Sequence, residues 1–130
     1  MIDTLFDKNI DLISKAMDLQ LLRHSVIADN IANAETPGFK ARKVDFEKEL
    51  QRAVEANESG MINPAGRGLA SLEPSIYQDP EAEMGADLNT VDMDREMAAL
   101  TKNDVKYSAA TQAISQKFSL LKYAITEGGR

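Results

Sequence analysis

The feature that most constrains this chain is a repeat of apolar side chains, seven residues apart, in both of its end segments. In the N-terminal segment the repeat consists of Leu5, Leu12, Leu19 and Val26. In the C-terminal segment one row contains Met93, Leu100, Tyr107, Ile114 and Leu121, and an adjoining row contains Met97, Phe118 and Ile125. Apolar residues at this spacing lie along one face of an α-helix. The pattern therefore predicts two long amphipathic helices that pack through these residues, within the chain or between subunits.

Turn-forming residues set the limits of these helices. No Gly or Pro interrupts residues 1–36, and Pro37-Gly38 follows them. Because a residue before proline avoids the helical region, the first helix is expected to end near Asn33. The chain then divides into a helical domain, formed by an N-terminal helix in 1–36 and a C-terminal helix in 89–127, and a middle arm, 37–88.

The middle arm shows no long periodic pattern. A short helix is predicted around residues 45–56, where apolar residues share one helix face. Residues 60–85 contain three of the four prolines and four of the seven glycines, and only Ile76-Tyr77 is typical of a short extended piece. The pattern leaves open whether residues 57–88 form a small β-hairpin, lie along a neighbouring chain or stay mobile.

Helix length excludes a compact globule. At about 1.5 Å per residue, a helix over residues 4–33 is about 45 Å long and one over residues 91–126 about 54 Å long. A globule of this size has a diameter of only roughly 36 Å. We therefore predict an all-α, elongated fold: an antiparallel, coiled-coil-like pair of helices, with the irregular arm projecting from one end or folded along the side. Two helices leave part of each apolar stripe uncovered, so full burial requires helices from other chains.

Composition argues against most catalytic and ligand-binding functions. The chain has no cysteine, which excludes disulfides and thiolate sites, and its one histidine, His24, disfavours a histidine-based metal site or a catalytic triad. No apolar run approaches the roughly 20 residues of a membrane span. The first residues lack the basic start and apolar stretch of a signal peptide. We expect no enzyme, no cofactor, no metal and no small-molecule substrate.

Charge is unevenly distributed along the chain. The net charge of −6 argues against a nucleic-acid partner. Residues 53–96 hold ten acidic residues against two basic ones, whereas residues 97–130 hold five basic residues against two acidic ones. The basic group Lys40, Arg42 and Lys43 is interpreted as solvated or as facing acidic residues of a neighbouring subunit.

The start of the C-terminal helix is acidic. Asp92, Asp94 and Glu96 lack the glycine and the ligand spacing of a calcium-binding loop. We interpret them as compensating the helix dipole, with Asn89 or Thr90 as the N-cap.

A motif lies where the first helix meets the arm. Residues 28–40 read ADNIANAETPGFK, and the motif residues are Asn30, Asn33, Thr36, Pro37, Gly38 and Phe39. The two Asn side chains share a helix face, where their amides can bridge to a neighbouring helix, and Asn33 can also bind the terminal carbonyls. The Pro-Gly pair predicts a sharp turn at the end of the helix, of type II geometry. Phe39 would then fold back as an apolar anchor.

This motif resembles the signature of the bacterial flagellar rod and hook family. A second resemblance lies in the C-terminal helix, where residues 89–97 read NTVDMDREM and residues 117–122 read KFSLLK. The resemblance covers about residues 1–50 and 87–126. Within the basal-body rod proteins, this helix is more similar to that of the proximal rod protein than to that of a sister rod protein of similar size.

The resemblance implies a structural subunit of the flagellar basal-body rod, which spans the periplasm. Such subunits assemble through their terminal helices into the axial drive shaft for motility. The implied partners are copies of itself, other rod subunits, and the membrane-ring and export-gate end of the basal body. The resemblance also implies export by the flagellar type III secretion apparatus, without a cleaved signal peptide.

Two other functions remain open at this point. A soluble helical-hairpin adaptor, such as a secretion chaperone, could use the same apolar stripe to hold a client helix. The motif argues against it, because a chaperone has no reason to carry that run. The sister rod protein is the second alternative. A small hydrolase lacks both a Gly-rich loop and a usable base.

Overall fold

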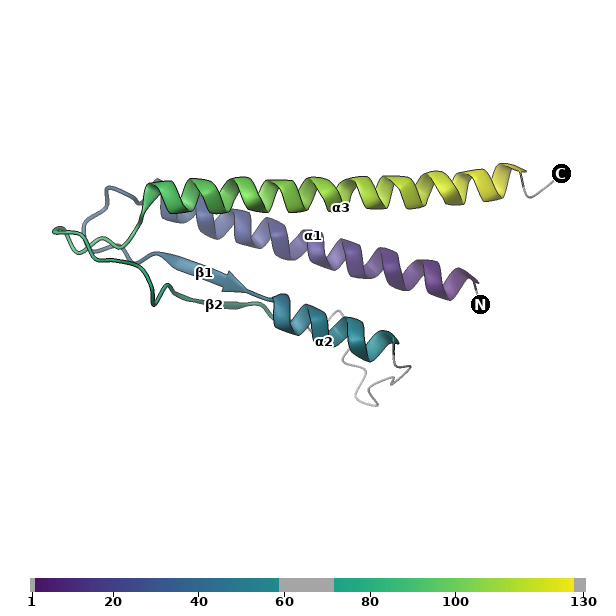
Figure 1. Ribbon diagram of the computed structural model, residues 1–130, viewed down its shortest axis with the longest axis horizontal. Helices are drawn as coiled ribbons and strands as arrows, with labels where there is room; N and C mark the ends of the chain where they lie inside the picture. Colours follow the sequence, from purple (N-terminus) through teal and green to yellow (C-terminus); the bar gives the residue numbers. More distant parts are fainter. Residues whose placement is uncertain (1, 59–71, 128–130) are drawn as a thin grey trace.

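The structure is a computed structural model that describes the backbone of residues 2–58 and 72–127 and the side chains of residues 9–55 and 72–127. Two long helices run antiparallel, so that both chain ends lie at one pole of an elongated molecule (Figure 1). The elements in chain order are α1 (Ile2–Ala32), β1 (Arg42–Asp45), α2 (Glu47–Glu58), β2 (Ser75–Gln78) and α3 (Met93–Glu127). The predicted packing of a long N-terminal helix on a long C-terminal helix is confirmed, and a small strand pair is added to the mostly helical fold.

Helix α1 ends at Ala32, which agrees with the end expected near Asn33. The N–H of Asn33 is shared between the carbonyl oxygens of Asp29 and Asn30, each at 3.1 Å, and Ala34 N–H bonds Ile31 O at 3.2 Å. This tightening of the last turn uses carbonyl groups that a helix end leaves without partners.

Helix α3 begins at Met93, and its N-cap is Asp92. The Asp92 Oδ1 atom accepts the N–H groups of Asp94 at 3.0 Å and Arg95 at 3.1 Å. The prediction of Asn89 or Thr90 as the cap is wrong, because both side chains bond other segments.

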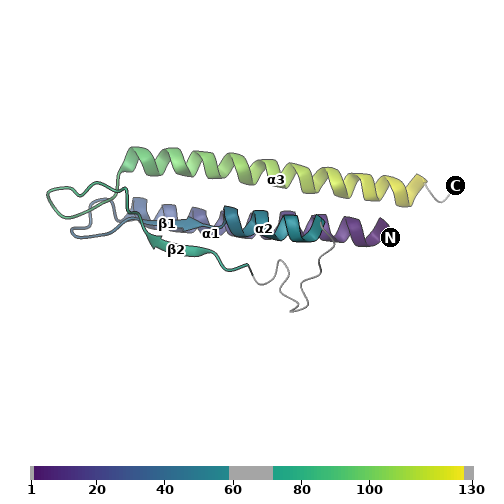
Figure 2. The same ribbon diagram turned by 60° about the horizontal axis from the view of Figure 1, so that its bottom comes forward.

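The middle arm folds back along α1: β1 lies against α1, β2 pairs with β1, and α2 contacts the core of α1 through Leu50 (Figures 1 and 2). Strands β1 and β2 pair antiparallel, with Val44 opposite Ile76. The extended piece expected at Ile76-Tyr77 is therefore confirmed. Its partner strand lies before α2, at 42–45, and not within 57–88.

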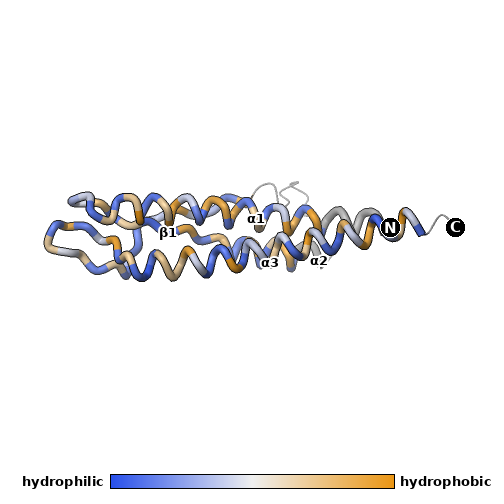
Figure 3. Tube along the Cα trace, turned by 90° about the horizontal axis from the view of Figure 1, so that it is seen from above, coloured by the Kyte–Doolittle hydropathy of each residue, from blue (hydrophilic) through white to orange (hydrophobic). Residues whose placement is uncertain are grey.

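The core occupies only the half of the helix pair next to the arm. Leu19 and Val26 of α1 pack with Val44 and Phe46. Among the described side chains, all buried residues fall within 19–46 and 89–103. Apolar residues continue along both helices towards the chain ends (Figure 3), where the described side chains are half-buried or exposed. The hairpin is thus closely packed at one pole and loosely packed at the other.

Candidate functional site

The structure divides the heptad residues into three groups. Leu19 and Val26 are buried. The half-buried ones are Leu12, Leu100, Tyr107, Ile114 and Leu121. The exposed ones, all on α3, are Met93, Met97, Phe118 and Ile125, the last with 77% of its surface accessible. The Leu5 side chain lies outside the described residues. A single chain therefore leaves a large part of the α3 apolar surface uncovered.

Asn30 is the most buried polar residue of the motif, with an exposed fraction of 0%. Its Nδ2 donates to Arg42 O at 2.8 Å and to Glu96 Oε2 at 3.1 Å, and its Oδ1 accepts the Arg42 N–H at 3.0 Å. One amide thus joins α1, β1 and α3. Burial raises the pKa of Glu96 above its ordinary value, and the bond from Asn30 opposes this rise.

Asn33, Thr36 and the Pro-Gly pair form the turn that leaves α1. Asn33 Nδ2 donates to Asp29 O at 2.8 Å, and its Oδ1 accepts the Thr36 hydroxyl at 3.2 Å. Phe39 N–H bonds Thr36 O at 3.2 Å across Pro37-Gly38. Gly38 has a φ of 75°, which the third position of a type II turn requires.

Asn89, which is distant in sequence, binds this turn through its side-chain amide. Its Nδ2 lies 2.9 Å from Asn33 O, 3.0 Å from Ala34 O and 2.7 Å from Thr36 O. The side chain therefore satisfies carbonyl groups beyond the end of α1, which is the task of a helix C-cap. The sequence identified Asn89 only as a cap of its own helix, because a partner more than fifty residues away leaves no local pattern.

Further hydrogen bonds join the two chain segments that meet at this pole. Gly38 N–H bonds Asp87 O at 2.9 Å, and Thr90 N–H bonds Phe39 O at 3.0 Å. The Ala41 N–H bonds the Thr90 hydroxyl at 2.9 Å. We call these two segments, residues 33–41 and 85–90, the connector.

Each side chain of the basic group of the arm binds an acceptor of its own chain, while those of Arg42 and Lys43 stay partly exposed. Lys40 Nζ donates to Leu88 O at 2.8 Å, Arg42 pairs with Asp29 at 3.1 Å, and Lys43 pairs with Asp79 at 3.0 Å. The group is therefore paired within its own chain and still partly solvated, and its contact with acidic residues of a neighbouring subunit stays a prediction.

Arg23 anchors the arm to α1. Its guanidinium binds both carboxylate oxygens of Glu47, at 2.6 and 2.7 Å, and Val44 O at 2.7 Å. It also lies 4.3 Å from the centre of the Phe46 ring. The two-pronged bond lowers the pKa of Glu47 to about 2. Sequence reasoning missed this contact.

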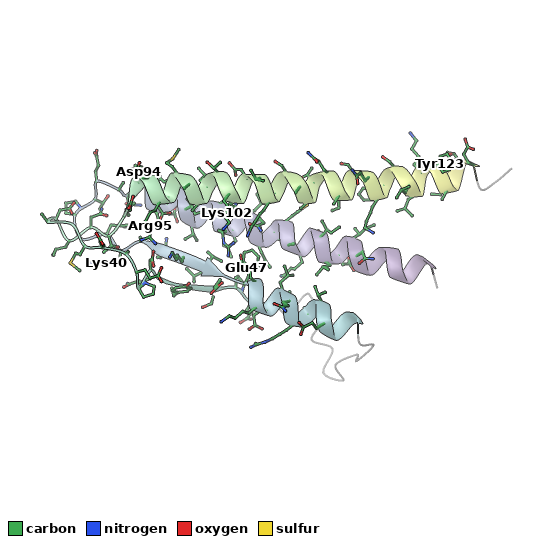
Figure 4. All side chains as sticks on the ribbon, in the orientation of Figure 1. Lys40, Glu47, Asp94, Arg95, Lys102 and Tyr123 are labelled. Carbon is green, nitrogen blue, oxygen red and sulfur yellow. The ribbon has the colours of Figure 1, made fainter. Side chains whose placement is uncertain are left out.

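A groove of about 430 Å³ lies between α1, α3, β1 and the start of α2. Figure 4 shows Lys102 of α3 and Glu47 of α2, which line this groove. Asn103 lines it and is only 3% exposed. Its Nδ2 donates to Gln20 O at 2.9 Å, and its Oδ1 is buried without a hydrogen-bond partner among the described residues.

The described residues contain little that resembles catalytic or metal chemistry. His24 is exposed and lies 3.3 Å from Asp104. Among residues 2–58 and 72–127, no three His, Cys, Asp or Glu side chains gather in a way that could hold a metal ion. None of the helices described here has the length and apolarity to cross a membrane.

Known proteins resemble this chain in the region of the motif and over nearly its whole length. Residues 12–40, which contain the motif and most of the buried part of α1, match a family described as flagella basal body rod protein. The chain is 35% identical to the flagellar basal body rod protein FlgB of Borrelia hermsii, over 93% of this chain and 98% of the relative. The chain belongs to the flagellar basal body rod protein family.

Other rod proteins of the family show a similar extent of likeness. The FlgB proteins of Proteus mirabilis and Escherichia coli are 34% and 29% identical, each over 88% of this chain and 90% of the relative. The resemblance inferred from the sequence is therefore confirmed, for the FlgB-like group of the family. These relatives do not favour the adaptor or chaperone, nor the sister rod protein FlgC.

Proposed function

We propose that this chain is a structural subunit of the proximal flagellar rod, which assembles through its terminal helices into the axial drive shaft for motility. The observation that carries the proposal is the uncovered apolar surface of α3. Phe118 and Ile125 belong to a predicted packing row and yet are exposed in the single chain. Since apolar burial contributes about 25 cal/mol per Å² of surface, neighbouring helices on this row stabilise the assembly.

In this proposal the connector and the helix ends have different tasks. The connector, which includes Asn33 and Asn89, holds the two helices together within one subunit, and Asn30 of α1 adds a bond to α3. The heptad residues near the chain ends pack against helices of neighbouring subunits. Torque then passes through packed side chains from one subunit to the next, and the subunit itself has no need for catalysis.

Location and partners follow from the same role. The subunit contacts copies of itself, other rod subunits, and the membrane-ring and export-gate end of the basal body. It lies in the part of the rod that spans the periplasm, and it is exported by the type III secretion apparatus without a cleaved signal peptide. A chain without cysteine suits passage through a narrow channel in an unfolded state, since no disulfide can form before assembly.

Fractionation of flagellated cells tests the proposal. A rod subunit sediments with detergent-resistant basal bodies, whereas a chaperone or adaptor stays in the soluble fraction. We expect an epitope-tagged chain, in cells that lack the native copy, to restore swimming and to sediment with the basal bodies. Restored swimming with all of the chain in the soluble fraction contradicts the proposal.

A further inference from the structure

One loop of the connector pole carries features that the fold does not explain. Residues 80–88, which we call the tip loop, lie at the far left in Figure 1, beyond the start of α3. Met84 and Leu88 are 60% and 58% exposed. The loop also carries three acidic residues, Glu81, Glu83 and Asp87, and no basic one.

The tip loop is held in one shape. Gly85 N–H bonds Asn89 O at 2.8 Å, and Leu88 N–H bonds Gly85 O at 3.0 Å. Lys40 Nζ binds Leu88 O at 2.8 Å. Leu88 has a φ of 64°, a left-handed conformation that is uncommon for a leucine. The hydrogen bonds therefore hold a strained residue whose apolar side chain faces outward.

The groove between α1, α3 and β1 has the opposite charge. Its charged lining consists of six basic residues, Arg23, Arg42, Lys43, Lys48, Lys102 and Lys106, and three acidic residues. Within the described part of the chain, Lys48 and Lys102 have no acidic partner. The chain as a whole carries a net charge of −6, so this positive surface is a local exception.

The groove also offers apolar surface. Val26, Ile27 and Tyr77 line it beside the lysines. An incoming segment with acidic side chains and exposed apolar side chains matches both the basic and the apolar lining.

We infer that the tip loop of one copy of this chain binds in the groove of a second copy, with Glu83 facing Lys102 and with Met84 and Leu88 on the apolar lining. This inference rests on the proposed rod function and adds a specific contact to it. The tip loop and the groove are different surfaces of the same chain. A contact between them is heterologous, so it joins copies into an open series or a ring rather than a closed dimer. A rod needs a contact of that kind.

Cysteine cross-linking tests the contact directly, because the native chain has no cysteine. A chain with Met84→Cys and Lys102→Cys is expressed in flagellated cells, and the isolated basal bodies are oxidised. We expect a ladder of disulfide-linked dimers and larger multimers. The matched control carries Met84→Cys and Gln112→Cys, the latter at an exposed position of α3 outside the groove lining. Linked multimers several-fold above this control support the contact, and yields equal to the control overturn it.

A charge exchange provides the second test. Lys102→Glu and Glu83→Lys each place like charges together at the contact, and we expect each to lower the amount of chain recovered with basal bodies by about tenfold. The double variant restores the attraction with reversed signs, so recovery should return towards the native level. Recovery in the double variant no better than in the weaker single variant contradicts the contact.

The two proposals fail in different ways. If the native chain sediments with basal bodies but neither the cross-link nor the charge rescue is seen, the tip-to-groove contact is wrong and the rod function stands. If the native chain is not recovered with basal bodies, the rod function is wrong, and the contact that rests on it is wrong as well.

Discussion

The side-chain amide of Asn89 lies 2.7 Å from the backbone oxygen of Thr36, so the residue that introduces the second long helix also completes the turn that ends the first. Two neighbouring carbonyl oxygens share the same amide. This contact makes the connector one unit of structure, although its two segments lie far apart in the sequence.

Asn89→Ala removes the amide that the carbonyl groups of Asn33, Ala34 and Thr36 share, and also the acceptor of the Val91 N–H. We expect a loss of about 1–3 kcal/mol in the free energy of unfolding, measured by urea denaturation followed by circular dichroism. Gln112→Ala, at an exposed position of α3, is the control and should change the free energy by less than about 0.5 kcal/mol. Equal effects of the two substitutions would show that the amide contributes nothing.

Glu96 makes stability depend on pH in an unusual direction for a carboxylic acid. Its pKa is raised above 4.5 in the folded chain, so between 4.5 and the folded value the native state binds more protons than the unfolded state. The free energy of unfolding therefore falls as pH rises through that window. Glu96→Gln keeps the acceptor for Asn30 and removes the charge. We expect the variant to be more stable than the native chain at neutral pH and to lose this advantage below pH 4.5. A constant difference at all pH values argues against a charged Glu96 as its source.

Glu47 acts in the opposite direction. Its pKa of about 2 in the folded chain lies below the ordinary 4.5, so its contribution to stability is present above pH 4.5 and is lost as pH falls towards 2. Arg23→Met removes the main cause. We expect the Glu47 carboxyl, followed by NMR, to titrate close to 4.5 in this variant. An unchanged titration of Glu47 would show that a group other than Arg23 causes its low pKa. Arg52→Met, on an exposed pair within α2, is the matched control.

Phe118→Asp tests whether the exposed row of α3 is an interface. Because Phe118 is already exposed in the single chain, the substitution should leave the circular dichroism spectrum and thermal midpoint of the free chain unchanged. It should abolish incorporation into basal bodies and swimming, since a carboxylate in an apolar contact is costly. Gln116→Asp introduces the same charge on the same helix, outside the predicted rows, and is expected to swim. Leu121→Asp should also block assembly, with secretion of the chain intact. A motile Phe118→Asp strain would exclude this row as the contact.

The unequal packing of the two poles predicts unequal hydrogen exchange. In a dilute monomer, the amides of residues 93–103 lie beside the buried core, whereas those of residues 107–127 lie where no described side chain is buried. We expect the second group to exchange many-fold faster, because local opening needs less free energy where fewer apolar contacts are lost. Equal, full protection along the whole of α3 in a monodisperse monomer contradicts this expectation. The assembled rod should protect both groups.

The parts of the fold that follow from local pattern were predictable from the sequence. Leu19 and Val26 are seven residues apart, and so are Leu100 and Tyr107. This spacing is visible in the local sequence, and it predicted the positions of both long helices. The antiparallel pair then followed from helix length. The hydrogen-bond partners of the motif residues were harder to predict. Asn30 contacts Arg42 and Glu96, which the fold brings next to it from other elements.

What the sequence did not reveal depends on contacts between distant segments. Strand β1 has only four residues and pairs with a strand beyond α2, so it shows no alternation long enough to detect. Arg23 and Glu47 are brought together by the packing of α2 beside α1. An exposed charge on a predicted helix is usually solvated, and nothing local distinguishes Arg23 from such a residue.

Because the buried contacts lie at one pole, the two helices can rotate relative to each other about that pole. The connector fixes one end, and α3 extends about 52 Å from it at 1.5 Å per residue. A rotation of only about 5° at the fixed end displaces the far end by about 4–5 Å, roughly the spacing of neighbouring strands and comparable with one helical turn. One sequence can thus occupy positions that are not strictly equivalent, such as the first and last layers of an assembly, by changing the spread of its helices and not its fold.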